Sequence, residues 1–155
     1  MPNPEDVKRI AKATADFYND HGGTDLEGFV KKYWEPDVKL YHGGHGEPHG
    51  VEQFLAMHSA EAGFSWDDTH MVVKKVVVGE DSFVIQMNIT QWRSHEADAI
   101  EASGDDSRQA AIEGYQNEAI PAITFYTVGD GGKVVQTEGF VFLSPQLLAA
   151  GAANT

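Results

Sequence analysis

The stretch TDLEGFVKKYWEPDVKL, residues 24–40, carries the strongest fold signal in this chain. Thr24 and Glu27 have the S/T-x-x-E spacing of a capping box, in which two side chains satisfy backbone amides at the start of a helix. Apolar residues then recur at helical spacing, at Leu26, Phe29, Val30, Tyr33 and Trp34. Pro36 is expected to end this helix, and the alternation that follows predicts a short strand from Val38 to His42.

Helical patterns lie on both sides of this stretch. Before it, one apolar face is formed by Val7, Ile10, Ala11, Thr14, Phe17 and Tyr18, and residues 19–23 stop that helix. After it, a third helix is expected from about Val51 to Ala62, stopped by Gly63. The first half of the chain is therefore predicted to be mainly helical.

The second half has the pattern of strands. Four candidates are joined in pairs by turn-forming residues at 79–82 and 129–132, and they cover Thr69–Val78, Phe83–Arg93, Ala119–Val128 and Lys133–Phe142. Helices followed by strands predict an α+β fold in which the helices pack on one face of a mostly antiparallel sheet.

Length and composition exclude several classes of protein. A chain of 155 residues fits one domain, with a core at about 4–144 and a loosely packed tail at 145–155. The net charge of −13 opposes binding to nucleic acid. The chain has no cysteine, which excludes disulfides and thiolate metal ligands. It lacks an apolar run of membrane-spanning length and an N-terminal signal-peptide pattern, so we expect a soluble, cytoplasmic protein.

Residues 96–118 are strongly acidic and contain few large apolar side chains. This segment is longer than an ordinary connection between strands. It is interpreted either as a solvated loop or as a lid over a site.

Strand alternation separates two kinds of face. On Phe83–Arg93, one side carries Phe83, Ile85, Met87 and Ile89, and the other Val84, Gln86, Asn88, Thr90 and Trp92. On the next strand Ile123 and Phe125 oppose Ala122, Thr124 and Tyr126; on the last, Phe140 and Phe142 oppose Thr137, Gly139 and Val141. If the mixed face lines a ligand cavity, the apolar face with Ile85 and Phe125 is expected to contact a second subunit. In the opposite arrangement the apolar face lies under the helices.

The loop HGGHGEPH, residues 42–49, contains three histidines. His42 shares a strand face with Val38 and Leu40, so its imidazole is expected to point inward. There it is either a proton carrier, since its ordinary pKa is about 6.5, or a structural histidine bonded to a carbonyl. A third hypothesis is a metal site of His42, His45 and His49, although their spacing matches no compact metal-binding signature.

The order of these elements resembles the cone-shaped fold of nuclear transport factor 2, ketosteroid isomerase, scytalone dehydratase and the small polyketide cyclases. The resemblance spans nearly the whole chain, and three stretches carry it: residues 24–40, GEPHG at 46–50 and GGKV at 131–134. It implies a curved sheet with three helices on its concave face, and dimers formed through the outer sheet face. The superfamily contains enzymes and non-enzymes, so the fold alone does not imply catalysis.

The resemblance also implies site residues. His42 occupies the position of the general-base aspartate of ketosteroid isomerase, and Thr124 that of its second acid, so the two-carboxylate machinery is missing. The histidine pair of scytalone dehydratase corresponds to His70 and Asn88. Its first-helix aspartate and tyrosine correspond to Asp16 and Tyr18, which point about 200° apart on a helix.

We therefore expect an apolar cavity for a small organic ligand, and an enzyme that transfers protons without a cofactor or metal, as an isomerase, dehydratase or polyketide cyclase does. His42 or His70 moves the proton, and Asn88 or Tyr18 stabilises the oxyanion. The expected substrate-binding residues are Trp34, Phe54, Trp66, Gln86, Thr124, Tyr126 and Val141. The alternatives are a non-catalytic ligand-binding module and a metal-dependent enzyme using the histidine loop.

Overall fold

The computed structural model describes residues 1–19, 25–43, 45–59, 69–91 and 120–142. The helices in these residues are α1 (Pro4–Asn19), α2 (Leu26–Tyr33) and α3 (Val51–Met57). The strands are β1 (Trp34–His42), β2 (His45–His49), β3 (Thr69–Val78), β4 (Ser82–Gln91), β5 (Ile120–Val128) and β6 (Val134–Val141). The acidic segment 96–118, the tail 145–155 and Trp66 lie outside the described residues.

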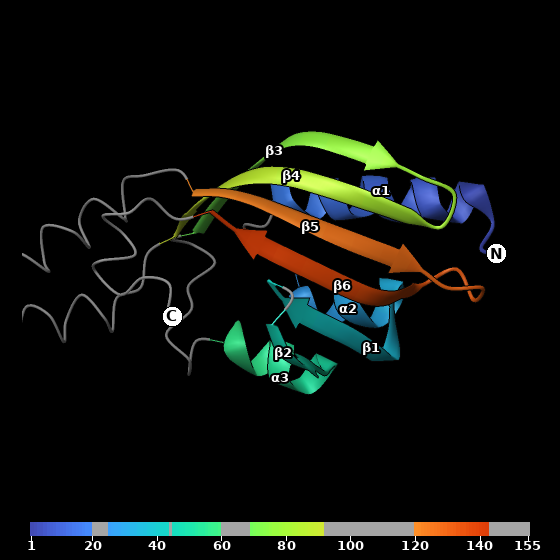
Figure 1. The fold of residues 1–155 in the computed structure, drawn as a ribbon, viewed down its shortest axis with the longest axis horizontal. Helices are drawn as coiled ribbons and strands as arrows, with labels where there is room; N and C mark the ends of the chain where they lie inside the picture. The colour runs from blue at the N-terminus through green and yellow to red at the C-terminus, as the bar shows by residue number, and fades with distance from the viewer. Residues whose placement is uncertain (20–24, 44, 60–68, 92–119, 143–155) are drawn as a thin grey trace, which may run out of the picture.

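The strands form one curved sheet in the order β2-β1-β6-β5-β4-β3. Neighbouring strands are antiparallel except β1 and β6, which run parallel. Figure 1 shows α1 and α2 on the same side of this sheet, behind the strands in that view. The predicted α+β class, with helices on one face of a mostly antiparallel sheet, is confirmed. None of the helices in the described residues combines the length and apolarity needed to cross a membrane.

The junction of α2 and β1 differs from its prediction in detail. The N-cap of α2 is Asp25, which makes no side-chain capping bond, so the predicted capping box with Glu27 does not set this boundary. The helix ends at Tyr33, and Trp34 is already extended, with φ −114° and ψ 147°. The residue before a proline is pushed out of the helical region, and here the extended backbone begins one residue earlier still.

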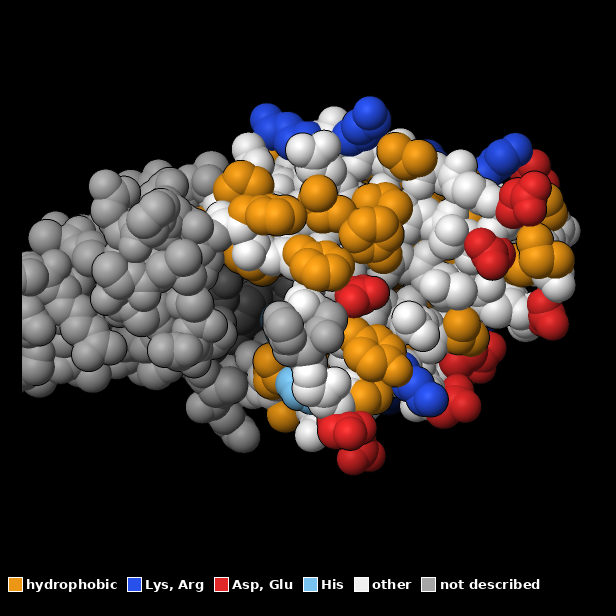
Figure 2. All heavy atoms as spheres, in the orientation of Figure 1, with side chains coloured by type: hydrophobic (Ala, Val, Ile, Leu, Met, Phe, Trp, Pro, Cys, Tyr) orange, Lys and Arg blue, Asp and Glu red, His pale blue; other side chains and the backbone are white. Residues whose placement is uncertain are grey.

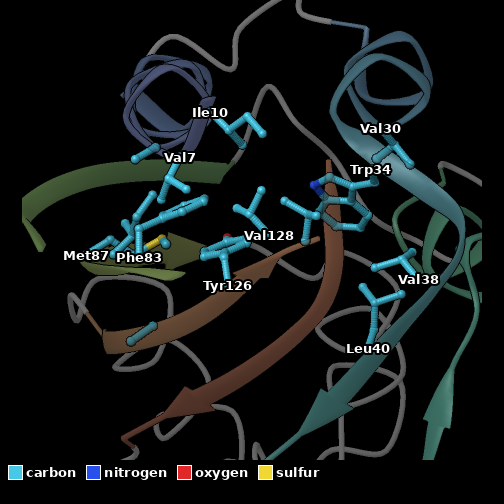
Figure 3. Packing of buried hydrophobic residues seen from close by; sticks show 14 residues of the cluster. Val7, Ile10, Val30, Trp34, Val38, Leu40, Phe83, Met87, Tyr126 and Val128 are labelled. Carbon is cyan, nitrogen blue, oxygen red and sulfur yellow. The ribbon is translucent and has the colours of Figure 1, made fainter. Parts of the chain in front are cut away.

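The hydrophobic core lies between the helices and the inner face of the sheet (Figure 3), and part of it is at the end where α1 begins. Val7 and Ile10 of α1 are fully buried, and they pack in one cluster with Phe83, Val128 and Val134 from β4, β5 and β6. The ring of Phe83 stacks on that of Tyr126 with centroids 4.6 Å apart. This end of the fold is closed by side chains.

Glycine closes the turn between β5 and β6. Gly132 has φ +73°, a left-handed backbone that residues with a side chain rarely adopt. A Cβ there would lie 2.9 Å from the carboxylate of Asp6 on α1. The left-handed backbone is therefore the main reason that glycine is favoured in this turn.

The register of β4 and β5 corrects the predicted grouping of strand faces. Ile85 pairs with Thr124 and Met87 with Ala122, so the aliphatic side of β4 and the mixed side of β5 share the inner face. Ile85 is 0% exposed, whereas Phe125 is 47% exposed on the outer face. The prediction that Ile85 and Phe125 share one face was wrong, because alternation along each strand does not specify which sides of two strands coincide.

The outer face of the sheet carries an apolar patch, which we call the outer patch. Figure 2 shows hydrophobic side chains gathered over the strands on this side of the molecule. By strand alternation and register its members are Val72, Val77, Val84, Ile123, Phe125 and Phe140. Phe125 and Phe140 meet edge to face, with ring centroids 6.0 Å apart.

Candidate functional site

A cavity of about 210 Å³ lies between the helices and the inner face of the sheet. Its wall includes residues near the edge where β1, β4 and β6 end and β3 and β5 begin, opposite the closed end of the core. Most of the wall is apolar, formed in large part by Phe17, Leu26, Phe29, Trp34, Leu40, Phe54, Met71, Met87, Ile89, Ala122 and Val141. Such a wall with a few polar groups is typical of a small-molecule site.

Two tyrosine hydroxyls meet inside this cavity. The oxygen of Tyr18, on the last turn of α1, lies 2.5 Å from that of Tyr126 on β5. Burial raises the pKa of Tyr18, and burial together with the neighbouring Tyr18 raises the pKa of Tyr126 well above its usual value. Both hydroxyls therefore stay protonated at neutral pH and can act as hydrogen-bond donors. Thr124, which also lines the cavity, makes a side-chain hydrogen bond with Tyr126.

Trp34 lines part of the cavity wall. Its side chain is 5% exposed, and the indole ring packs on Phe54 of α3 with centroids 5.1 Å apart. The Nε1 atom is buried and has no hydrogen-bond partner among the described residues.

His42 is a lining residue at the last position of β1, at the open end of the cavity, and its side chain is exposed. Its ring lies 4.7 Å from that of His49 on β2. Burial lowers the pKa of His42, and the charge of a protonated His49 lowers it further. The imidazole is therefore mainly neutral at neutral pH, the form that can accept a proton.

His58 is a cavity residue that the sequence analysis did not find. It caps the C-terminal end of α3, and its Nδ1 lies 2.8 Å from the carbonyl oxygen of Phe54. Because a carbonyl can only accept, Nδ1 carries the proton in this bond, which leaves the lone pair on Nε2. The sequence did carry a signal for His58. It lies four residues after Phe54 in a helical pattern, which places both side chains on the same face of the helix.

The cavity brings together seven of the predicted site residues from α1, α3, β1, β5 and β6. They are Tyr18, Trp34, His42, Phe54, Thr124, Tyr126 and Val141.

The other predicted residues lie elsewhere. Asp16 is exposed on α1, with its carboxylate 2.6 Å from Lys12 Nζ. Gln86 is exposed, and both Gln86 and Asn88 alternate with the inner residues of β4, so they lie on the outer face. His70 pairs with Thr90 near the start of β3, and its side chain is outside the described structure. The strands of His42 and His70 are separated by β6, β5 and β4.

The histidine loop forms the β1–β2 hairpin, in which His42 pairs with His45 and Leu40 with His49. Within the described side chains, no group of three His, Cys, Asp or Glu is arranged to hold a metal ion. The side chain of His45 is not among them. His49 Nδ1 is buried without a hydrogen-bond partner among the described residues.

Comparison with known proteins gives a consistent picture of the fold. No family model matches the chain, and no curated protein matches it. Among solved structures, a candidate SnoaL-like polyketide cyclase from Jannaschia sp. CCS1 is 20% identical, with a TM-score of 0.63 over 95% of this chain and 92% of its own. A steroid delta-isomerase from Pseudomonas aeruginosa is 12% identical, with a TM-score of 0.60 over 95% and 87%.

An NTF2-like protein of unknown function from Mesorhizobium loti is 15% identical, with a TM-score of 0.59 over 92% of this chain and 98% of its own. Identities this low are informative about architecture only. The chain shares the α+β fold of these cyclase, isomerase and NTF2-like structures.

Proposed function

We propose that this protein is a small-molecule enzyme that transfers protons, without a cofactor, on a compact and mostly apolar carbonyl compound. The observation that carries the proposal is the hydrogen-bonded pair of Tyr18 and Tyr126 hydroxyls inside an otherwise apolar cavity. Isomerisation, dehydration and aldol-type cyclisation share one step, in which a C–H proton leaves while negative charge develops on the carbonyl oxygen. A site for this step needs a donor for that oxygen and a base for that proton.

The tyrosine pair supplies the donor. The pair holds two hydroxyl protons, and only one can lie between the two oxygens. The other can be donated to a substrate oxygen, and the raised pKa values keep it in place at neutral pH. In an apolar cavity a fixed donor stabilises developing negative charge more strongly than water does, typically by about 10²–10³-fold in rate.

His42 supplies the base. Its lowered pKa leaves the imidazole neutral at neutral pH, and its place in the cavity wall gives it access to a bound ligand. His58 is a second candidate, because its Nδ1 bond to Phe54 directs the lone pair to Nε2. His70 remains a third candidate at the same end of the sheet. Asp16 and Asn88 have no role in this proposal, because both lie away from the cavity.

The proposal is tested by deuterium exchange into 2-tetralone, a compact bicyclic ketone with acidic C–H bonds, followed by NMR in heavy water. The wild-type protein is expected to accelerate exchange. Y126F should lower the acceleration by about 10²–10³-fold, and H42Q by about 10²–10⁴-fold. K39A, at an exposed position of β1, is the control and should match the wild type.

A non-catalytic binding module is the second candidate function, and the dominance of apolar side chains in the cavity wall favours it. The same assay separates the two. A wild-type protein that binds 2-tetralone but leaves its exchange rate at the uncatalysed value would contradict the enzymatic proposal and support the binding module.

We also propose that two copies of the chain associate through the outer patch. Val77 and Phe125 are 51% and 47% exposed there and lie beside half-buried Val84, Ile123 and Phe140, while Val72, which is 50% exposed, lies farther along β3, opposite Asn88. A contiguous apolar surface on a sheet favours burial against a partner. A second copy would cover the patch with a surface of the same composition.

A further inference from the structure

Gly139 of β6 leaves a recess in the sheet wall of the cavity. Gly139 lines the cavity, and strand alternation puts it on the same side of β6 as Thr137, which also lines it. A Cβ added to Gly139 would lie 3.6 Å from the hydroxyl oxygen of Thr124. Apart from its chain neighbours, no other described residue has an atom within 4 Å of that Cβ position. Among the described residues, the space that a side chain would take is therefore open.

This recess lies between the groups that the proposed reaction needs. Figure 1 shows β6 between β1 and β5, and Gly139 pairs with His42 on one side and with Thr124 on the other. The backbones of His42 and Thr124 are therefore about 10 Å apart, with no side chain in the row between them. Thr124 makes a side-chain hydrogen bond with Tyr126. Hydroxyl groups thus border one side of the recess, and the imidazole of His42 borders the other.

The local backbone does not explain a glycine at this position. The described glycines with positive φ are Gly43, Gly46 and Gly132, and Gly139 is not one of them. Its pairing with both neighbouring strands continues without a register shift, so it marks no bulge. Glycine within a strand is unfavourable because it adds freedom to the unfolded chain and packs against nothing. Such a glycine is typical of a place that a ligand approaches closely.

We propose that Gly139 determines the specificity of the site, because its missing side chain admits the reacting edge of a flat ring ketone between His42 and the hydroxyls of Thr124 and Tyr126. In this position the C–H bond next to the carbonyl faces the imidazole, and the carbonyl oxygen faces the hydroxyls. The inference rests on the proposed function in one respect, namely that this cavity is the substrate site. It goes further by locating the reacting atoms and by assigning a role to Gly139.

The test adds one methyl group to the recess and measures the dissociation constant of 2-tetralone by calorimetry. G139A should weaken binding about tenfold, because overpacking of an occupied space by one methyl group typically has an effect of this size. G139V should weaken it further. G50A is the control, because it adds the same methyl group at an exposed position outside the cavity wall, where its Cβ would meet no described atom within 4 Å. It should bind 2-tetralone as the wild type does.

Two further measurements separate a blocked recess from a damaged fold. G139A should unfold at the same urea concentration as the wild type or at a higher one, because alanine restricts the unfolded chain and its methyl group fits beside Thr124. The second measurement uses the wild type alone, in ordinary water. The α-protons of Gly139 should show nuclear Overhauser contacts to the methylene protons next to the carbonyl of bound 2-tetralone.

Unchanged binding of 2-tetralone by G139A, or bound 2-tetralone without contacts to Gly139, would overturn the inference and leave the enzymatic proposal standing. If G139A unfolds much more readily than the wild type, the strand itself requires glycine, and the contacts in the wild type alone decide. A wild type that does not bind 2-tetralone would overturn the inference together with the cavity assignment. Weaker binding by G139A, without deuterium exchange catalysed by the wild type, would support the inference while contradicting the enzymatic proposal.

Discussion

At the scale of single residues, His42 combines an inner strand position with an altered acidity. Burial lowers its pKa first, and the nearby His49 lowers it further. A histidine whose pKa is lower in the folded state than in the unfolded state binds fewer protons when folded. Its contribution to the free energy of unfolding is present above about pH 6.5 and is lost as the pH falls through the folded pKa. Protonation of His42 also removes the lone pair with which it would act as the proposed base.

We therefore expect His42 to titrate below about pH 6.5, as followed by the imidazole resonances in NMR spectra. The exchange rate of 2-tetralone should decline along the same acid limb. In H49Q the pKa of His42 should rise part of the way back, because burial, the larger cause, remains. A His42 that titrates at or above its ordinary value would contradict this account of the site.

At the scale of elements, the periodic patterns predicted well which segments form helices and which form strands, because these patterns reflect burial on one side of each element. The apolar residues of α1 that were selected by spacing include Val7, Ile10 and Phe17, which are all buried. The strand register was not predictable, because it depends on how β4 and β5 align across a long connection. For the same reason Gln86 and Asn88 were selected for the cavity although their strand positions face outward.

Asn19 at the end of α1 provides a test of how α1 is attached to the sheet. Its side-chain oxygen accepts a hydrogen bond of 3.0 Å from the backbone N–H of Val73, beside the register shift in β3. N19A should lower the free energy of unfolding in urea by about 1 kcal/mol. It should also accelerate hydrogen exchange of the Val73 amide, while N19D, which keeps an acceptor, should lie closer to the wild type. An unchanged exchange rate in N19A would show that this bond does not hold α1 against β3.

At the scale of the whole molecule, the fold separates a closed core from a cavity end, and α1 and α2 lie on one side of the sheet. The fold was predictable because three short stretches resemble a known architecture. The polar contacts in the cavity were harder to predict, because they join residues distant in the sequence, as Tyr18 and Tyr126 are. The burial of the Trp34 nitrogen away from any acceptor in the described residues is likewise a property of packing, which spacing along the chain does not encode.

The outer patch predicts the oligomeric state. Wild-type protein should sediment as a dimer in analytical ultracentrifugation, and F125D should shift it to monomer with unchanged circular dichroism. A56D, at an exposed position of α3, is a control that adds the same single negative charge. The equivalent change at Ile85 would instead disrupt the core, because that side chain is fully buried. A wild type that sediments as a monomer at high concentration would exclude the proposed interface.

The central claim is that the Tyr18–Tyr126 pair polarises a carbonyl inside the cavity. The most direct measurement is the carbon-13 resonance of carbonyl-labelled 2-tetralone bound to the wild type and to Y126F. We expect the bound resonance to move downfield in the wild type and to return toward its value in apolar solvent in Y126F. A bound carbonyl resonance that is the same in both proteins would contradict the account.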